Sequence, residues 1–189
     1  MNKVDFDRFV SNKNIILIGF KHVGKSLIGR HLATRLNKQF IDLDKSIETR
    51  YAETYGEACS CHQIVQTQGE AIFRALESAT LEGVIHSENC VIALGGGTAF
   101  SACNQAMIQD HLLLHVDAPR GIVFERIMVN GRPAFFDLNK DPYESFNDLW
   151  NDRHKIYKKL TKHTINNSHT VEQAVNQALI YVSQHESCI

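Results

Sequence analysis

The segment GFKHVGKS, from Gly19 to Ser26, has the residue types and spacing of a phosphate-binding loop, G-x-x-x-x-G-K-[ST]. Gly19 and Gly24 allow the backbone to turn sharply and to close around a phosphate. The loop N–H groups and the start of the next helix would supply the anion site. Lys25 would reach the β- and γ-phosphates of a nucleotide, and Ser26 would ligate Mg²⁺. We therefore predict a nucleotide phosphate site here.

His22 is the irregular residue of this loop. The general pattern leaves its position free, so we expect phosphate binding to survive. A positive φ at His22 would cost about 1 kcal/mol more than at glycine. A partly protonated imidazole would instead favour the negative charge of a nucleotide. The sequence leaves both alternatives open.

Two acids end the second predicted strand, in the string FIDLD. Because Asp42 and Asp44 are two apart at the end of a strand, we expect them to share one face of it. Asp42 could hold Mg²⁺ through water, and Asp44 could act as a base or orient an acceptor hydroxyl. The structural alternative is an exposed strand end with an aspartate cap for the next helix.

Two further segments carry groups that could contact a ligand. Arg74 and Glu77 are three apart on a predicted helix, and a surface salt bridge is the simpler interpretation of that pair. The string LGGG places Gly95, Gly96 and Gly97 at the end of a buried strand, where their backbone N–H groups could receive a ligand oxygen. A flexible turn is the alternative for these glycines.

The polar segment NGRPAFFDLNKDP, residues 130–142, is punctuated by glycine and proline and lies between helical patterns. We interpret it as a mobile lid. Arg132, near its middle, could close over a transferring phosphoryl group and stabilise its charge. Arg153 follows in NDRHKIYKKL, where the simpler interpretation is a solvated basic helix face.

These residues need a scaffold, and the chain alternates apolar runs with helical patterns. We predict strands at 14–19, 39–44, 90–97, 111–117 and 163–166. Helices are expected at 24–37, from 45 to about 86 with a break at Tyr55-Gly56, after Pro119 and at 170–182. This order predicts one domain over 1–189, with a three-layer α/β/α fold and a five-stranded parallel sheet of the P-loop NTPase type. The segments that follow the first three strands should converge at one edge of that sheet.

The composition of the chain limits the partners and the location that we expect for it. The chain has 189 residues and a net charge of −1, which gives no electrostatic case for a nucleic-acid or membrane partner. Its apolar runs are too short to span a bilayer, and the first residues have no secretory signal pattern. Five cysteines then suggest free thiols in the cytoplasm. In the string CSCH, we expect Cys59 and Cys61 to pack on or near a helix rather than to bind a metal.

The remaining motifs narrow the class of nucleotide-binding protein. A GTPase needs the guanine-reading string N-K-x-D, but NKDP has Pro142 in place of the acid. Motors and large ATPases need a longer chain. The chain resembles shikimate kinase in an ordered set of motifs. These are GxxxxGKS, FxDxD, GExxFR, GGG after the third strand, RP in a lid and an arginine shortly before a tyrosine. The resemblance covers about residues 13–183.

In that family ATP phosphorylates the 3-hydroxyl of shikimate, and the resemblance implies roles for residues of this chain. Substrate contacts would come from Asp44, which is also the presumed base, and from Arg74, Gly95, Gly96, Gly97 and Arg153, with Glu77 orienting Arg74. The ATP site would comprise Gly19, His22, Val23, Gly24, Lys25, Ser26, Leu27, Arg126 and Arg132. Mg²⁺ would be held by Ser26 and, through water, by Asp42. The catalytic residues would be Lys25, Asp44 and Arg132.

The resemblance also implies regions and partners. Residues 44–85 would form the substrate-binding helices, residues 129–142 the lid, and residues 166–168 would flank the adenine. We expect ATP and shikimate as partners, no nucleic acid, no membrane and a monomer. His22, the aromatic RPAFF string and ETYGEACSCHQIVQTQ depart from the family pattern. The alternatives are another small-molecule kinase, such as a gluconate kinase, and a regulatory protein that binds nucleotide without catalysis.

Overall fold

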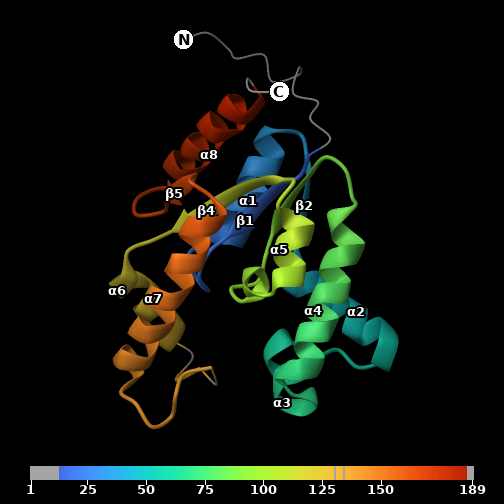
Figure 1. Cartoon of the computed structure of the whole chain (residues 1–189), viewed down its shortest axis with the longest axis vertical. Helices are drawn as coiled ribbons and strands as arrows, with labels where there is room; N and C mark the ends of the chain where they lie inside the picture. Colours follow the sequence, from blue (N-terminus) through green and yellow to red (C-terminus); the bar gives the residue numbers. More distant parts are fainter. Residues whose placement is uncertain (1–12, 130, 134, 187–189) are drawn as a thin grey trace.

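A parallel sheet of five short strands forms the centre of the molecule (Figure 1). The computed structural model describes residues 13–129, 131–133 and 135–186. The strands are β1 (Ile15–Ile18), β2 (Gln39–Asp42), β3 (Cys90–Ala93), β4 (Leu112–Asp117) and β5 (Thr164–Asn166). They lie in the order β2-β3-β1-β4-β5. The predicted five-stranded parallel sheet is therefore confirmed.

Both faces of the sheet are buried, as the short continuous apolar strands predict. On β1, Ile15 and Leu17 belong to one hydrophobic cluster, whereas Ile16 and Ile18 belong to the other. The parallel register aligns the carboxyl ends of the neighbouring strands, since Leu17 pairs with Ala93 and also with a residue of β4. The loops after β1, β2 and β3 consequently meet at one edge of the sheet.

Helices cover both faces of the sheet, so the molecule has three layers (Figure 1). Helices α1 and α8 pack together on one side, and α4 and α5 pack together on the other. Helices α2 and α3 extend the second layer beside α4. The helices are α1 (Lys25–Arg35), α2 (Leu43–Tyr55), α3 (Cys61–Gln68), α4 (Glu70–Ile85), α5 (Ala102–Ile108), α6 (Arg120–Met128), α7 (Pro142–Leu160) and α8 (Val171–Glu186), with a short 3₁₀ helix η2 (Thr98–Phe100).

Several boundaries differ from those expected. The break at Gly56 is confirmed, because this residue ends α2 in the left-handed conformation. A second break at Gly69, with φ of 84°, was not predicted and separates α3 from α4. Pro119 is the residue before α6 rather than part of its first turn. The last helix continues to Glu186, four residues beyond the predicted end at 182.

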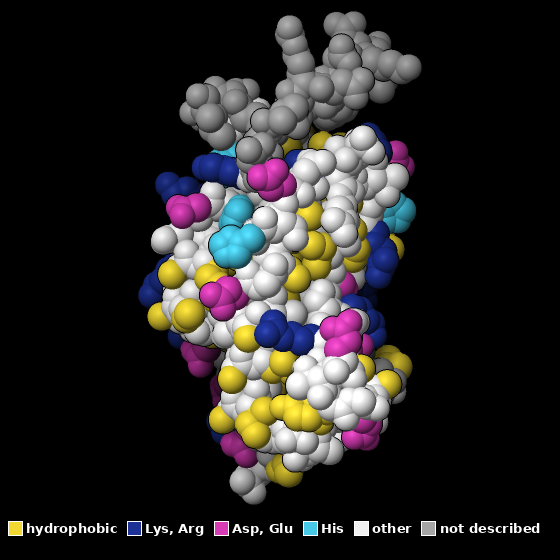
Figure 2. Space-filling view, turned by 90° about the vertical axis from the view of Figure 1, so that its right-hand side faces the viewer, with side chains coloured by type: hydrophobic (Ala, Val, Ile, Leu, Met, Phe, Trp, Pro, Cys, Tyr) yellow, Lys and Arg dark blue, Asp and Glu magenta, His cyan; other side chains and the backbone are white. Residues whose placement is uncertain are grey.

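The surface and the helices bear on the predicted partners. Within the described ranges, no helix combines the length and the apolarity needed to cross a bilayer. On the face that Figure 2 shows, basic and acidic side chains are interspersed rather than segregated. The single domain over 1–189 stays a prediction.

Candidate active site

The phosphate loop has a backbone that only glycine allows at two positions. Gly19 and Gly24 have φ of 146° and 101°. A Cβ at Gly19 would lie 2.3 Å from the carbonyl oxygen of Val116, and one at Gly24 would lie 2.4 Å from Nδ2 of Asn167. The Asn167 amide also donates to the carbonyl of Val23 at 2.8 Å, so the segment after β5 holds the loop from behind. The predicted strand, loop and helix are all present.

Lys25 lies in the first turn of α1 with its side chain buried. Its ammonium group donates to the carbonyls of Gly19 and Phe20, at 2.9 and 2.8 Å. Burial lowers the pKa of Lys25 to about 8, and the charges of Asp44 and Asp42 oppose this shift. The ammonium is thus held inside the loop by weak neutral acceptors, which the oxygens of a phosphate could replace.

His22 has a φ of 65°, which puts a non-glycine residue in the left-handed region. The residue is exposed. Partial burial of the ring, followed by the charges of Lys21, Lys25 and Arg126, lowers its pKa. The φ of 65° is the positive value that the strain alternative assumes. Arg126 donates to the carbonyl of His22 at 3.1 Å, at the rim of the loop.

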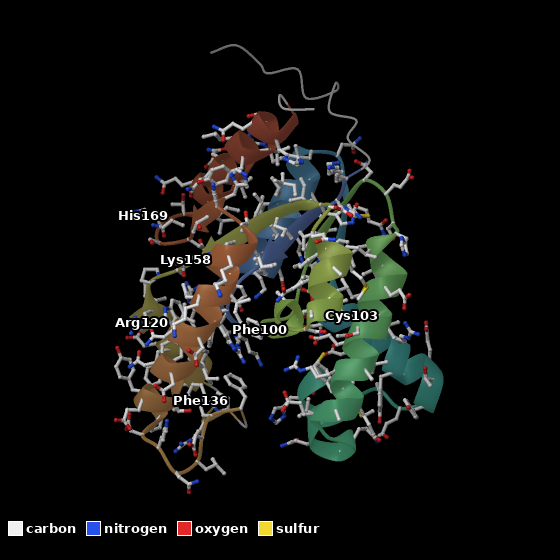
Figure 3. All side chains as sticks on the ribbon, in the orientation of Figure 1. Phe100, Cys103, Arg120, Phe136, Lys158 and His169 are labelled. Carbon is white, nitrogen blue, oxygen red and sulfur yellow. The ribbon has the colours of Figure 1, made fainter. Side chains whose placement is uncertain are left out.

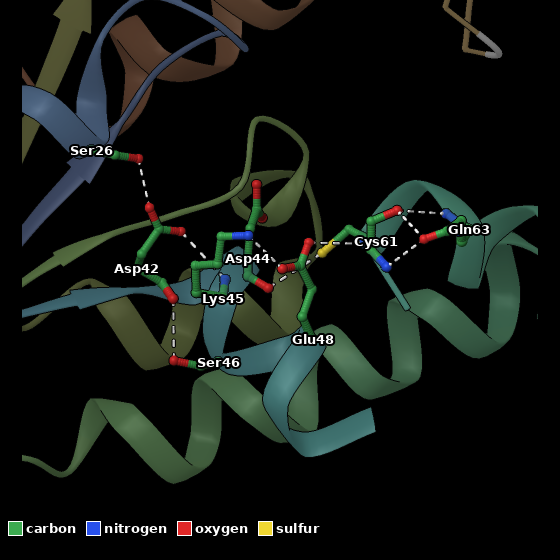
Figure 4. A network of polar contacts seen from close by, with 9 residues as sticks. Ser26, Asp42, Asp44, Lys45, Ser46, Glu48, Cys61 and Gln63 are labelled. Atoms are coloured by element: carbon green, nitrogen blue, oxygen red, sulfur yellow. Dashed lines mark hydrogen bonds and ion pairs between the residues drawn. The ribbon is translucent and has the colours of Figure 1, made fainter. Parts of the chain in front are cut away.

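The two acids do not share a strand face, and that expectation is wrong. The strand β2 ends at Asp42, whose carboxylate accepts the backbone N–H of Lys45 and caps helix α2. Asp44 is therefore in the first turn of a helix. Asp42 also accepts a hydrogen bond of 2.6 Å from the hydroxyl of Ser26 (Figure 4). This pair supplies one hydroxyl and one carboxylate oxygen at the phosphate loop, a donor set that suits Mg²⁺.

Asp44 nevertheless points toward the same site. A Cβ built on Gly95 would lie 2.8 Å from Oδ1 of Asp44, so the glycine allows the carboxylate to approach the loop after β3. Burial raises the pKa of Asp44; Lys25 opposes this shift, and Asp42 and Glu77 add to it. A carboxylate with a raised pKa and close to the phosphate loop is a suitable proton acceptor.

Arg74 and Glu77 are not a surface salt bridge, because the side chain of Glu77 is only 2% exposed. Nη1 of Arg74 donates to Glu77 at 2.9 Å, and the hydroxyl of Thr98 donates to the other Glu77 oxygen at 2.7 Å. Burial lowers the pKa of Arg74, but Glu77 and then Glu70 outweigh it, so the net direction is upward. Glu77 thus fixes a charged guanidinium next to the glycine loop.

The glycine loop after β3 is tightly enclosed by the residues expected to line the site. A Cβ on Gly97 would lie 2.8 Å from Nη1 of Arg74, and one on Gly96 would lie 3.1 Å from the backbone nitrogen of Lys21. The loop therefore contacts both α4 and the phosphate loop. A side chain at Gly97 would have to displace the end of the Arg74 side chain, so the glycine allows the guanidinium to approach the loop closely.

Arg153 is also not part of a solvated helix face. Its guanidinium carbon lies 4.8 Å from the ring centroid of Phe20, 5.3 Å from that of Phe100 and 5.7 Å from that of Phe135. Burial lowers the pKa of Arg153; Tyr157 opposes this shift, and the charge of Arg74 adds to it. An arginine stays protonated even so, and cation–π contacts stabilise it.

In the sequence, the tyrosine after Arg153 and the RPAFF string stand out only as motifs, and we assigned no site role to Phe20, Phe100, Phe135 or Tyr157. Figure 3 shows Phe100 between α7 and the α4–α5 side of the molecule. Phe20 directly follows Gly19, and Tyr157 lies one helical turn after Arg153 and so on the same face of α7. These two spacings could have indicated their place. Nothing in the sequence relates Phe100 or Phe135 to Arg153.

The structure does not place Arg132 over the phosphate loop. Its Nη2 donates to the carbonyls of Asp137 and Lys140, within the segment expected to be a lid. Its contribution to phosphoryl transfer therefore stays a prediction that requires the segment to rearrange. Phe135 of the same segment does lie at the site. Its ring contacts Arg153, and its centroid is 5.9 Å from Nζ of Lys21. Residues 130 and 134 lie outside the described residues.

The CSCH string has a structural role, as expected. Ser60 caps α3 in a reciprocal arrangement with Gln63. The Cys61 thiol donates to the carbonyl of Asp44 at 3.4 Å, and Glu48 accepts the Cys61 backbone N–H (Figure 4). Cys59 and Cys61 both pack against the second hydrophobic cluster. The string thus anchors α3 to the helix that carries Asp44.

Comparison with known proteins supports one family. The family model described as shikimate kinase matches residues 21–183. A shikimate kinase of Clostridium botulinum is 34% identical over 164 residues, which cover 86% of this chain and 93% of that protein. A bifunctional shikimate kinase/3-dehydroquinate synthase of Thermotoga maritima is 32% identical over 143 residues. That match covers 76% of this chain and only 27% of the bifunctional protein.

A solved structure has the same fold. The shikimate kinase of Acinetobacter baumannii, in complex with shikimate, superposes with a TM-score of 0.81 at 24% identity. The superposition covers 96% of this chain and 98% of that one. The three-layer fold of the P-loop type predicted from the sequence is therefore confirmed.

Proposed function

Since the chain belongs to the shikimate kinase family, it is a kinase that uses ATP, and we propose that it phosphorylates the 3-hydroxyl of shikimate. The observation that carries this proposal is the placement of two guanidinium groups, Arg74 and Arg153, around a glycine loop that also touches Asp44. Shikimate is a small ring with one carboxylate and three hydroxyls. Two arginines suit the carboxylate, and one carboxylate suits a hydroxyl.

In the proposed reaction, the phosphate loop and Lys25 bind the phosphates of ATP and offset their negative charge. Asp44 accepts the proton of the attacking hydroxyl, while Arg74 and Arg153 fix the ring by its carboxylate. Phosphoryl transfer depends mainly on such positioning and charge stabilisation. Ser26 and Asp42 would hold Mg²⁺, which, when bound, neutralises charge on the phosphate oxygens. Arg132 would join the site on closure of the lid.

An acceptor panel tests the substrate. ADP release, measured by a coupled assay, should depend on shikimate and should be absent with gluconate, quinate or no acceptor. Turnover with gluconate alone would favour the gluconate kinase alternative. Nucleotide binding without turnover on any acceptor would favour the regulatory alternative. The variant Lys25→Met is the control, since it removes the phosphate-binding ammonium and should lose turnover with every acceptor.

Two other expectations remain proposals. We propose that the enzyme is a monomer and that it works in the cytoplasm. Light scattering of the purified chain tests the first, because a dimer would double the mass of 21.4 kDa. Fractionation of cells that express the chain tests the second, since a membrane or secreted fraction would contradict it.

A further inference from the structure

Three side chains with metal-binding atoms lie together at the carboxyl end of β4, beside the site described above. His115 and Asp117 are two apart on this strand and so face the same side of the sheet. His154 comes from α7, which packs over that side. One ring nitrogen of each histidine and one Asp117 oxygen lie within 4.8 Å of one another. The proposed phosphorylation uses none of the three.

His115 is a buried imidazole without polar partners. Its side chain is 1% exposed, and neither Nδ1 nor Nε2 has a hydrogen-bond partner. Its ring packs against that of Tyr157, with centroids 5.0 Å apart, and against that of His154, at 5.3 Å. Burying a polar ring in this way is unfavourable unless something binds one of the nitrogens.

His154 has a second unusual feature, because both of its ring nitrogens face acceptors. Nδ1 lies 3.1 Å from the carbonyl oxygen of Trp150, and Nε2 lies 3.1 Å from Oδ1 of Asp117. A neutral imidazole has one N–H and can donate to only one of them. A protonated ring donates to both, and its Nε2–H then pairs with the Asp117 carboxylate. A metal ion at Nε2 would replace that proton, and Nδ1–H would still donate to the Trp150 carbonyl, as in many metal-bound histidines.

We propose that His115, Asp117 and His154 form a Zn²⁺ site that joins β4 to α7. Two imidazoles and a carboxylate are typical Zn²⁺ ligands, whereas Mg²⁺ and Ca²⁺ prefer oxygen alone. Tetrahedral Zn²⁺ places its ligand atoms about 3.3 Å apart. The His154–Asp117 pair is already at 3.1 Å. His115 approaches from the same face, so a small closure completes the set and leaves the fourth position to water.

The residues around the proposed site limit its affinity for Zn²⁺ but allow the ion to enter from solvent. The charges of Lys158 (labelled on α7 in Figure 3) and Lys25 act on His115 and would oppose a bound cation. One carboxylate offsets only part of this charge. The side chains of Asp117 and His154 are 31% and 13% exposed, so an ion can reach them from solvent. The bound ion would fix the part of α7 that carries Arg153, next to His154.

Metal binding is tested directly, and apart from kinase activity, on the full chain without an affinity tag. After removal of metals with a chelator, Zn²⁺ is titrated by calorimetry and Co²⁺ by its visible absorption. Trp150, the only tryptophan, stacks on His154 at 4.2 Å and gives a fluorescence readout. The variants are His115→Gln and Asp117→Asn. The control is His31→Gln, an exposed histidine on α1.

We expect one Zn²⁺ per chain, a tetrahedral Co²⁺ spectrum without sulfur bands, and a change in Trp150 fluorescence. Both ligand variants should bind at least about tenfold more weakly, and the control should bind like the parent chain. The absence of binding, or equal binding by Asp117→Asn, would overturn the proposal. So would sulfur-to-metal absorption, which would assign the ion to cysteines. If His115→Gln fails to fold, the partly exposed Asp117→Asn decides the outcome.

Discussion

The hydroxyl of Tyr157 donates a hydrogen bond of 2.7 Å to the carbonyl oxygen of Gly96, which joins α7 to the glycine loop across 61 residues of sequence. Tyr157 is buried, so its hydroxyl makes this bond away from solvent. The ring packs against Phe100, at the end of the same loop, with centroids 5.6 Å apart. One side chain thus supports the loop through both a polar and an aromatic contact.

We expect Tyr157→Phe to weaken shikimate binding while preserving the fold. The ring contacts remain, but the Gly96 carbonyl loses its donor, which should lower the free energy of unfolding by about 1 kcal/mol. The KM for shikimate should rise several-fold, and the KM for ATP should change less than twofold. Tyr143→Phe, on the exposed start of α7, is the control. An unchanged KM for shikimate would contradict a supporting role for the hydroxyl.

The close approach of Gly97 to Arg74 gives a second prediction. In Gly97→Ala, the new methyl group would meet Nη1 of Arg74 at 2.8 Å and displace the guanidinium. We expect at least a tenfold loss in kcat/KM for shikimate, with ADP affinity unchanged. The matched control is Gly121→Ala on α6, where a Cβ meets nothing within 4 Å and alanine favours the helix. Equal activity of the two variants would show that Arg74 adapts freely.

The two arginines can be tested one at a time. Arg74→Ala and Arg153→Ala should each abolish measurable shikimate binding, because each removes a charged partner of the carboxylate. ADP affinity should stay nearly the same, as measured by calorimetry on the same preparations. Arg153→Lys is informative as well. A lysine keeps the charge but not the planar group that stacks between the aromatic rings, so we expect only partial recovery. Loss of both ligands would indicate misfolding instead.

The contiguous part of the site could be predicted from the sequence. Gly19, Gly24, Lys25 and Ser26 lie in one loop, and their spacing alone specifies the backbone that surrounds a phosphate. The strand that precedes them and the helix that follows are also local patterns. The structure confirms the strand, the loop and the helix. They could be predicted because short-range sterics determine them.

The parts that depend on tertiary contacts could not be predicted. The sequence FIDLD continues the apolar alternation of a strand, but Asp42 caps α2 and so turns Asp44 away from the strand face. The burial of Glu77 depends on Thr98, which is 21 residues away. Likewise, Arg153 is enclosed by rings from three separate loops. No local periodicity encodes these contacts.

Lys25 should make nucleotide binding pH-dependent. Its pKa of about 8 in the free protein means that the ammonium is charged below this pH and loses its proton above it. A bound diphosphate stabilises the charged form. ADP affinity, measured without added metal, should therefore be lower above pH 8 than at pH 7, and should fall by up to tenfold per unit above pH 8. Lys25→Met should bind ADP weakly, with no such dependence. If the ADP affinity of the parent chain did not change with pH, this would contradict the lowered pKa of Lys25.

His22→Gly tests the strained residue of the phosphate loop. Glycine adopts the φ of 65° without the steric cost of about 1 kcal/mol, but it also makes the unfolded chain more flexible. The two effects offset, so we expect the free energy of unfolding to change by less than about 1 kcal/mol. Activity should stay within about tenfold, because the phosphate-loop pattern leaves this position free. Denaturant unfolding and coupled kinetics measure both quantities, and a collapse of kcat in a folded His22→Gly chain would assign the imidazole a direct role in catalysis.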